Sequence, residues 1–130
     1  MNIKSALKKI VGIRTIREYI YNNPKKLKLI VFLYNKLFGF NRIRLHGNNL
    51  VIGSTILNRT TINILGKNNT IEIGDLGYMI NAKITILGNN NHVKIANHVK
   101  INYVRINIED DYNEILIGDK TSFHGTTDIA

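Results

Sequence analysis

Apolar and polar residues alternate in short stretches through the second half of the chain. The clearest stretch has apolar residues at Val93, Ile95, Val99, Ile101, Val104, Ile106 and Ile108. A period of two is typical of β-strands that bury one face. We therefore expect three short strands, at about 93–95, 99–101 and 104–108, with polar corners between them.

This unit recurs along the chain. Segments 47–53, 66–74, 88–96 and 110–118 can be superposed, and the last Asn of their turns is Asn49, Asn69, Asn91 and Asn113, a nearly constant spacing. A fixed period of this size is typical of a solenoid, in which each rung buries its apolar face against its neighbours. Three strands per period predict a mainly β chain folded as a parallel β-helix, with Asn side chains bonded from rung to rung. An antiparallel meander with Asn-rich hairpin turns is the alternative, but it does not require a registered period.

Charge divides the chain into two parts. Residues 1–45 contain eleven Lys or Arg and one acid, Glu18, whereas residues 46–130 contain seven basic and eight acidic residues. We expect a basic amphipathic helical arm at 1–41 and β-helix rungs at 42–130. In the arm, apolar residues recur at helical spacing from Ile3 to Ile20. Pro24 predicts the start of a second helix, which would run to about Leu37 and end before Gly39.

The arm suggests several roles. It could cap the first rung, lie on an anionic membrane surface or bind a partner. Nucleic-acid binding is not expected, because no recognition motif or stacking platform accompanies the basic residues. The longest apolar run, 29–34, is too short to span a bilayer or to form a signal-peptide core. We therefore expect a cytoplasmic protein, with peripheral contact to the inner face of the cell membrane through 1–41.

Composition limits the chemistry. The chain has 130 residues, enough for one domain with a modest core, and its 23 Ile and 19 Asn residues fit the predicted rungs and corners. The chain has no cysteine, which excludes disulfides, thiolate metal sites and a cysteine nucleophile. No metal site is expected, because His92 and His98 lack a third ligand. The acidic triplet 109–111 is interpreted as a solvated corner, since it lacks the alternating oxygen ligands of a calcium loop.

In the last part of the sequence, apolar residues recur at every sixth position. Ile117, Phe123 and Ile129 are evenly spaced, and the repeat is still running at Ala130. From this we expect the natural protein to be longer, with these rungs forming its N-terminal part.

The six-residue units 117–122 and 123–128, together with Ile73-Gly74-Asp75 and Ile95-Ala96-Asn97, resemble those of the hexapeptide-repeat acyltransferases. The resemblance covers about 42–130 and is closest to bacterial O-acetyltransferases of capsular and other surface polysaccharides. It implies a left-handed coil. Such a coil normally takes three hexapeptides per rung, which is less than the period of this chain, so we assign the excess to an enlarged Gly/Asn corner in each rung.

The resemblance also implies a function. It would be acetyl transfer from acetyl-CoA to a sugar hydroxyl of a surface polysaccharide or its precursor, by a homotrimer with acyl-CoA sites between subunits. A His would act as the general base, and the resemblance implies that it lies beyond Ala130. Within the chain the candidate is His124, a catalytic or substrate-binding residue, with Asp128 as its substrate-binding neighbour.

Two other functions remain open. A right-handed β-helix also accommodates rungs of this length and would favour polysaccharide cleavage, but most acids fall at corners and none forms an evident catalytic pair. A solenoid without catalytic activity, serving binding or structure, is the third interpretation.

Overall fold

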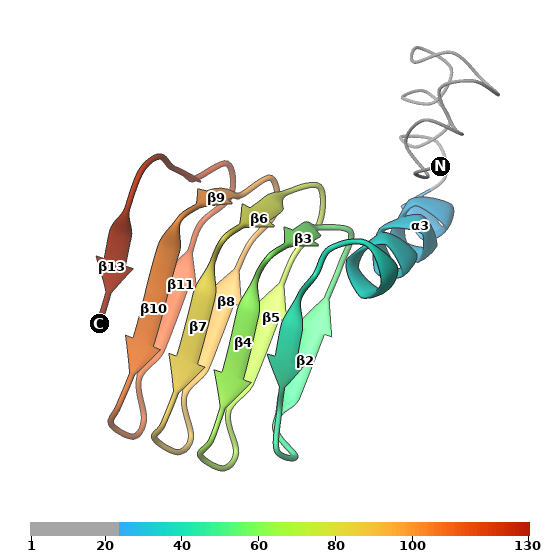
Figure 1. Ribbon diagram of the computed structural model, residues 1–130. Helices are drawn as coiled ribbons and strands as arrows, with labels where there is room; N and C mark the ends of the chain where they lie inside the picture. Colours follow the sequence, from blue (N-terminus) through green and yellow to red (C-terminus); the bar gives the residue numbers. More distant parts are fainter. Residues whose placement is uncertain (1–23) are drawn as a thin grey trace, which may run out of the picture.

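The computed structural model describes residues 24–130, so the helix expected between Ile3 and Ile20 lies outside the described part. The described chain is one helix followed by thirteen short strands wound into a coil (Figure 1). The predicted mainly β, parallel β-helix solenoid is thus confirmed. The expected second helix is also confirmed, since α3 spans Pro24–Leu37. The preference for a left-handed coil stays a prediction.

All strands lie in three parallel sheets, and each strand pairs with the one three places along the chain. Sheet 1 contains β1 (Arg42–Arg44), β4 (Thr61–Ile64), β7 (Lys83–Ile86), β10 (Val104–Ile108) and β13 (Thr127–Ile129). Sheet 2 contains β2 (Asn49–Ile52), β5 (Thr70–Ile73), β8 (His92–Ile95) and β11 (Glu114–Ile117). Sheet 3 contains β3 (Ile56–Asn58), β6 (Tyr78–Ile80), β9 (Lys100–Asn102) and β12 (Ser122–Phe123). One turn of the coil therefore adds one strand to every sheet.

The strands pair in the expected register over the central rungs. Ile71 lies opposite Val93, and Val93 lies opposite Ile115, so each step equals the period that separates Asn69 from Asn91. In the first step, however, Asn49 lies opposite Thr70 rather than Asn69. The predicted alignment of Asn49 with Asn69 is therefore wrong by one position.

The length of the corners explains this difference. Three residues, 53–55, connect sheet 2 to sheet 3 in the first rung, whereas four, 74–77 and 96–99, do so in the middle rungs, so the first step is one residue shorter. The Gly/Asn corners from sheet 1 to sheet 2 have four residues at 45–48 and five at 65–69 and 87–91. In the first of these corners His46 and Gly47 take positive φ, 47° and 84°. As predicted, the Gly/Asn corner is the longest corner in each of these rungs.

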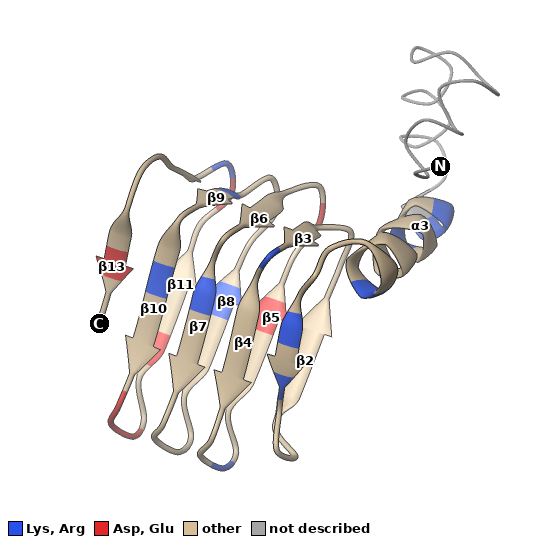
Figure 2. Cartoon of the chain, in the orientation of Figure 1, with Lys and Arg blue, Asp and Glu red and all other residues tan. Residues whose placement is uncertain are grey.

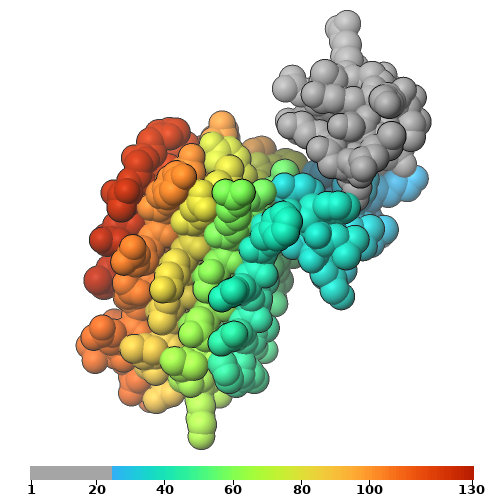
Figure 3. Space-filling model, viewed as in Figure 1, coloured from blue at the N-terminus to red at the C-terminus, as the bar shows by residue number. Residues whose placement is uncertain are grey.

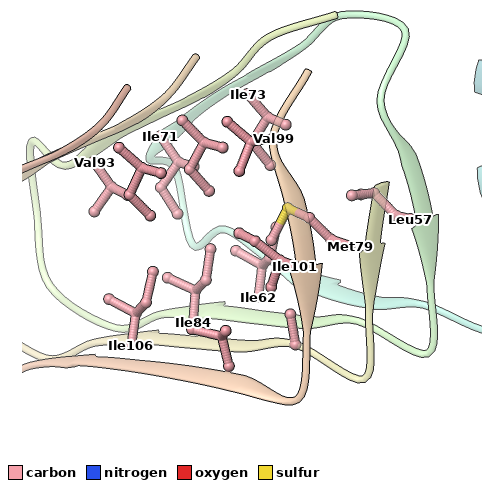
Figure 4. Close-up of a cluster of buried hydrophobic side chains, with 14 of the residues drawn as sticks. Leu57, Ile62, Ile71, Ile73, Met79, Ile84, Val93, Val99, Ile101 and Ile106 are labelled. Atoms are coloured by element: carbon pink, nitrogen blue, oxygen red, sulfur yellow. The ribbon is translucent and has the colours of Figure 1, made fainter. Parts of the chain in front are cut away.

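The core is a stack of aliphatic side chains inside the coil (Figure 4). Ile62, Ile84 and Ile106 occupy one register position on successive strands of sheet 1, and none is more than 1% exposed. Full burial of one such side chain contributes about 1.5–3 kcal/mol. The alternation seen in the sequence thus places one aliphatic layer of each rung directly on the next.

A buried row of Asn side chains ties the Gly/Asn corners together. Oδ1 of Asn48 accepts the backbone N–H of Asn69 at 2.8 Å, and Oδ1 of Asn69 accepts that of Asn91 at 2.8 Å. The Nδ2 group of Asn69 donates to the carbonyl of Gly88 at 2.9 Å. The predicted bonding of Asn side chains from rung to rung is confirmed, and each link joins an amide side chain to backbone.

Helix α3 covers the free edge of sheet 3 at β3. Asn35 accepts the backbone N–H of Leu57 at 2.8 Å and donates to the carbonyl of Thr55 at 3.1 Å. Asn41 donates to the carbonyl of Leu57 at 2.9 Å. These two side chains satisfy edge groups that a preceding strand would otherwise pair with. Gly39 lies in this contact, where a Cβ atom would be 2.5 Å from the Leu57 carbonyl.

Candidate functional site

The two residues chosen from the sequence lie at the far end of the coil. His124 is exposed in the segment between β12 and β13, and Asp128 projects from β13. Asp128 forms an exposed ion pair with Arg105, with 3.8 Å between its Oδ1 and the Arg Nε. Within residues 24–130 no hydrogen bond or ion pair joins His124 to Asp128. Their predicted role in catalysis or substrate binding stays a prediction.

Two other histidines occupy corners. The Nδ1 atom of His46 lies 3.0 Å from the carbonyl oxygen of Ile64, in the first Gly/Asn corner. His98 is exposed and has a φ of 56° in the corner between β8 and β9. Both side chains are therefore surface groups attached to turns.

The fourth histidine, His92, lies between two carboxylates on the outer face of sheet 2. Its Nε2 atom is 2.9 Å from Oε2 of Glu72, and its Nδ1 atom is 3.5 Å from Oε1 of Glu114. The three side chains are 37%, 44% and 60% exposed, in the order His92, Glu72, Glu114. We call this group the His92 cluster. It joins three successive rungs.

The strand pattern places the cluster on this face. Val93 and Ile95 point into the core, so His92 and Lys94 must point outward. In the register of sheet 2, His92 lies between Thr70 and Glu114, and Glu72 is the outward residue two positions after Thr70. Glu72 therefore reaches His92 diagonally, a distance that a long side chain can cover.

The His92 cluster was not expected from the sequence. The signal was present, because a shift by one period of the repeat puts His92 and Glu114 at the same slot and Glu72 on the same face. The predicted alignment of Asn49 with Asn69 was wrong by one position, but this error affects only the first rung. It does not hide the relationship among His92, Glu114 and Glu72.

Beside the cluster, a surface groove of about 520 Å³ follows the corner between sheets 2 and 3. Its lining combines the side chains of sheet 2 with the turns that follow β5, β8 and β11: Val51, Glu72, Ile73, Gly74, Lys94, Ile95, Ala96, Asn97, Gly118 and Asp119. We call it the corner groove. Glu72 belongs to both features, so the His92 cluster borders the corner groove.

Several acidic side chains in the corners accept hydrogen bonds from the backbone. Asp75 accepts the N–H of Ser54 at 2.8 Å, and Asp119 accepts the N–H of Asn97 at 2.8 Å. Asp111 accepts the N–H of Asn89 at 2.7 Å in the Gly/Asn corner. Their carboxylates are engaged in rung-to-rung links, which leaves Glu72 and Glu114 as the acids facing a common partner on one sheet.

A second groove, of about 590 Å³, lies at the N-terminal end of the coil between α3 and the first rung. Leu29 and Phe32 of the helix and Ile43 and Ile52 of the rung contribute its apolar lining. Lys25, Lys28 and Lys36 also line it. We call it the end groove.

The described residues contain no group of three or more His, Asp or Glu side chains arranged to hold a metal ion. Within residues 24–130, no helix is both long and apolar enough to cross a membrane.

Comparison of the chain with protein-family models, with curated proteins and with solved structures finds no match.

Proposed function

We propose that this chain is an O-acyltransferase of the hexapeptide-repeat type, which transfers acetyl from acetyl-CoA to a sugar hydroxyl of a surface polysaccharide or its precursor. The cytoplasm as its location and a homotrimer as its assembly belong to the same proposal.

The observation that carries the proposal is a repeated corner. Ile73-Gly74-Asp75, Ile95-Ala96-Asn97 and Ile117-Gly118-Asp119 each place a buried Ile before a small residue and an Asx. An oxygen of each Asx accepts a backbone N–H of the preceding rung. The six-residue rhythm thus coincides with a structural unit, and the corner groove runs along that unit.

The His92 cluster supplies a candidate general base within the chain. Glu72 would accept a hydrogen bond from Nε2–H and so keep the proton on that nitrogen, leaving Nδ1 as the basic nitrogen. Glu114, the more exposed carboxylate, lies 3.5 Å from Nδ1 and would have to turn away for an acceptor hydroxyl to approach. This cluster is an alternative to His124, the candidate chosen from the sequence.

In the proposed step, Nδ1 of His92 takes the proton of the sugar hydroxyl while the hydroxyl oxygen attacks the thioester carbonyl. The carbon–sulfur bond then breaks, an ester forms, and the leaving thiolate receives the proton from the imidazolium. Lys94 lines the corner groove beside the cluster and would pair with phosphates of coenzyme A.

A second candidate is a non-catalytic solenoid. It is favoured by the fact that both nitrogens of His92 face carboxylates, which also describes a cross-rung ion-pair ladder. In that case the cluster contributes only the modest stability of exposed pairs, about 0.2–1 kcal/mol each.

The two candidates are separated by measuring thiol release from acetyl-CoA with mono- and oligosaccharide acceptors. The chain contains no cysteine, so a thiol reagent detects coenzyme A without background from the protein. The acyltransferase proposal expects turnover that falls about 10²–10⁴-fold in His92→Gln, with His98→Gln as a matched control that keeps its rate. Absence of both turnover and acetyl-CoA binding at millimolar ligand would contradict it and favour the non-catalytic solenoid.

A further inference from the structure

Helix α3 and strand β1 carry only positive charge. The segment 24–45 contains six basic residues and no acid: Lys25, Lys26, Lys28, Lys36, Arg42 and Arg44. Figure 2 shows Lys and Arg on α3 and on the first strand of the coil, whereas the acidic residues lie further along. An acidic or phosphate-rich partner would therefore meet no repulsion from these two elements.

Several apolar side chains of α3 are exposed. Val31 is buried at 5% exposure, and Tyr34 and Asn35 contact the first rung. The exposed apolar side chains are Leu29 (59%), Phe32 (57%), Leu33 (40%) and Leu37 (63%), of which Leu29 and Phe32 line the end groove. A surface helix normally turns such residues toward the core, so this arrangement indicates a second contact outside the coil.

The docking of α3 fixes this orientation. Asn35 makes two hydrogen bonds to the edge of β3, and the hydroxyl of Tyr34 accepts one from Asn58 at 3.0 Å. These three hydrogen bonds hold α3 beside the first rung, at the N-terminal end of the coil (Figure 3). In this position Leu29 and Phe32 stay more than half exposed at the border of the end groove.

The basic side chains frame the apolar ones. At helical spacing, Lys25 and Lys36 fall on the same side of α3 as Leu29 and Phe32. The Lys36 ammonium lies 5.8 Å from the centre of the Phe32 ring. Phe40, which is 82% exposed, extends the apolar area beyond the end of the helix. Aromatic and aliphatic groups bordered by lysines are the composition of helices that lie in a membrane interface.

We infer that the exposed apolar side chains of α3 and Phe40, together with the lysines of the helix, dock on the surface of an anionic lipid bilayer. Leu29, Phe32 and Leu37 would enter the boundary of the acyl chains, while the lysines contact the phosphates. This inference goes beyond the proposed acyl transfer and does not depend on it.

Charge argues against two other occupants. A second copy docked face to face would bring the lysines of one α3 helix against those of the other, an unfavourable arrangement. Residues 1–23 carry five basic residues and one acid, so their charge does not complement that of α3 either. An anionic bilayer complements it, with each Lys or Arg increasing affinity about fivefold.

Tryptophan fluorescence tests the inference directly, because the chain contains no native Trp. Phe32→Trp would report from the docking surface, and Tyr112→Trp would report from an exposed corner of the last rungs. We expect the emission of the first to shift to the blue and to be quenched by brominated acyl chains in phosphatidylglycerol-containing vesicles, but not with phosphatidylcholine alone. The second probe should show neither effect.

Charge variants of the full chain give the matched comparison. Replacement of Lys25, Lys28 and Lys36 by Gln should weaken vesicle binding about 10²-fold, whereas replacement of Lys83, Lys94 and Lys100 on the coil should leave it unchanged. Three results would overturn the inference: no sedimentation with anionic vesicles, binding without a response of the Phe32→Trp probe, or a dimer in solution that depends on Leu29 and Phe32.

Discussion

The side-chain oxygen of Asn69 accepts the backbone N–H of Asn91 at 2.8 Å, and these two residues lie one full rung apart. The amide nitrogen of Asn69 donates into the same rung, to the carbonyl of Gly88. The fully buried side chain of Asn69 thus forms hydrogen bonds with two backbone groups of the next rung. Few other residue types carry a donor and an acceptor at this reach.

Asn69→Ala should destabilise the fold strongly, because it leaves a buried N–H and a buried carbonyl without partners. We expect a loss of about 3 kcal/mol in the free energy of unfolding, measured by urea denaturation. Asn49→Ala is the matched control, since Asn49 is exposed on the neighbouring strand, and its effect should stay within about 0.5 kcal/mol. Equal effects of the two substitutions would contradict a structural role of the buried Asn row.

Gly66 should tolerate no side chain. A Cβ atom there would lie 1.7 Å from the carbonyl oxygen of Gly88, a backbone atom of the next rung that cannot rotate away. Gly66→Ala should therefore cost about 3 kcal/mol or more. At Gly118 a Cβ atom would meet nothing within 4 Å, so Gly118→Ala should be nearly neutral in the same denaturation experiment. A neutral Gly66→Ala would show that the Gly/Asn corners are not packed as described.

Ile84 should be essential to the aliphatic stack. It is fully buried between Ile62 and Ile106 of the neighbouring strands, so Ile84→Ala should leave a cavity and cost about 2–5 kcal/mol. Leu87→Ala, at an exposed corner three residues later, should change the free energy of unfolding by less than about 0.5 kcal/mol. Equal losses of stability in Ile84→Ala and Leu87→Ala would contradict the assignment of Ile84 to the inside of the coil.

Asn35 should hold α3 against the coil. Removing its side chain in Asn35→Ala frees the N–H of Leu57 and the carbonyl of Thr55, which the helix otherwise covers. Amide hydrogen exchange should speed up at Leu57 by about 10-fold or more, corresponding to at least about 1.4 kcal/mol of local stability. The Ile84 amide, in the middle of sheet 1, should keep its protection. Unchanged exchange at Leu57 would mean that α3 is held by other contacts.

The sequence was sufficient to predict the coil, since every aliphatic residue of 93–108 chosen by alternation is buried in the structure. It was sufficient for α3 too, because Pro24 and Gly39 impose local backbone conditions at its two ends. Neither feature required knowledge of contacts between distant residues.

The candidate site was harder to predict from the sequence than the fold. The pair of His92 and Glu72 depends on a diagonal contact across two strands, which follows only once register and side-chain direction are both known. The first rung was misplaced by one position because the corner 53–55 is one residue shorter than 74–77, and because Asn48 and Asn49 are adjacent residues of the same type, so the sequence does not show which of them is equivalent to Asn69. The cap formed by Asn35 was equally hidden, as its partners Thr55 and Leu57 are distant in sequence and lie on another element.

The most direct test of the proposed function is to map acetyl-CoA binding by changes in the backbone amide NMR spectrum of the full chain. If the corner groove is the acyl-CoA site, the largest shifts will fall on 72–74, 94–97 and 118–119, and they will weaken in Lys94→Gln but not in Lys83→Gln. No shifts at millimolar acetyl-CoA, or shifts confined to another surface, would contradict the proposed site.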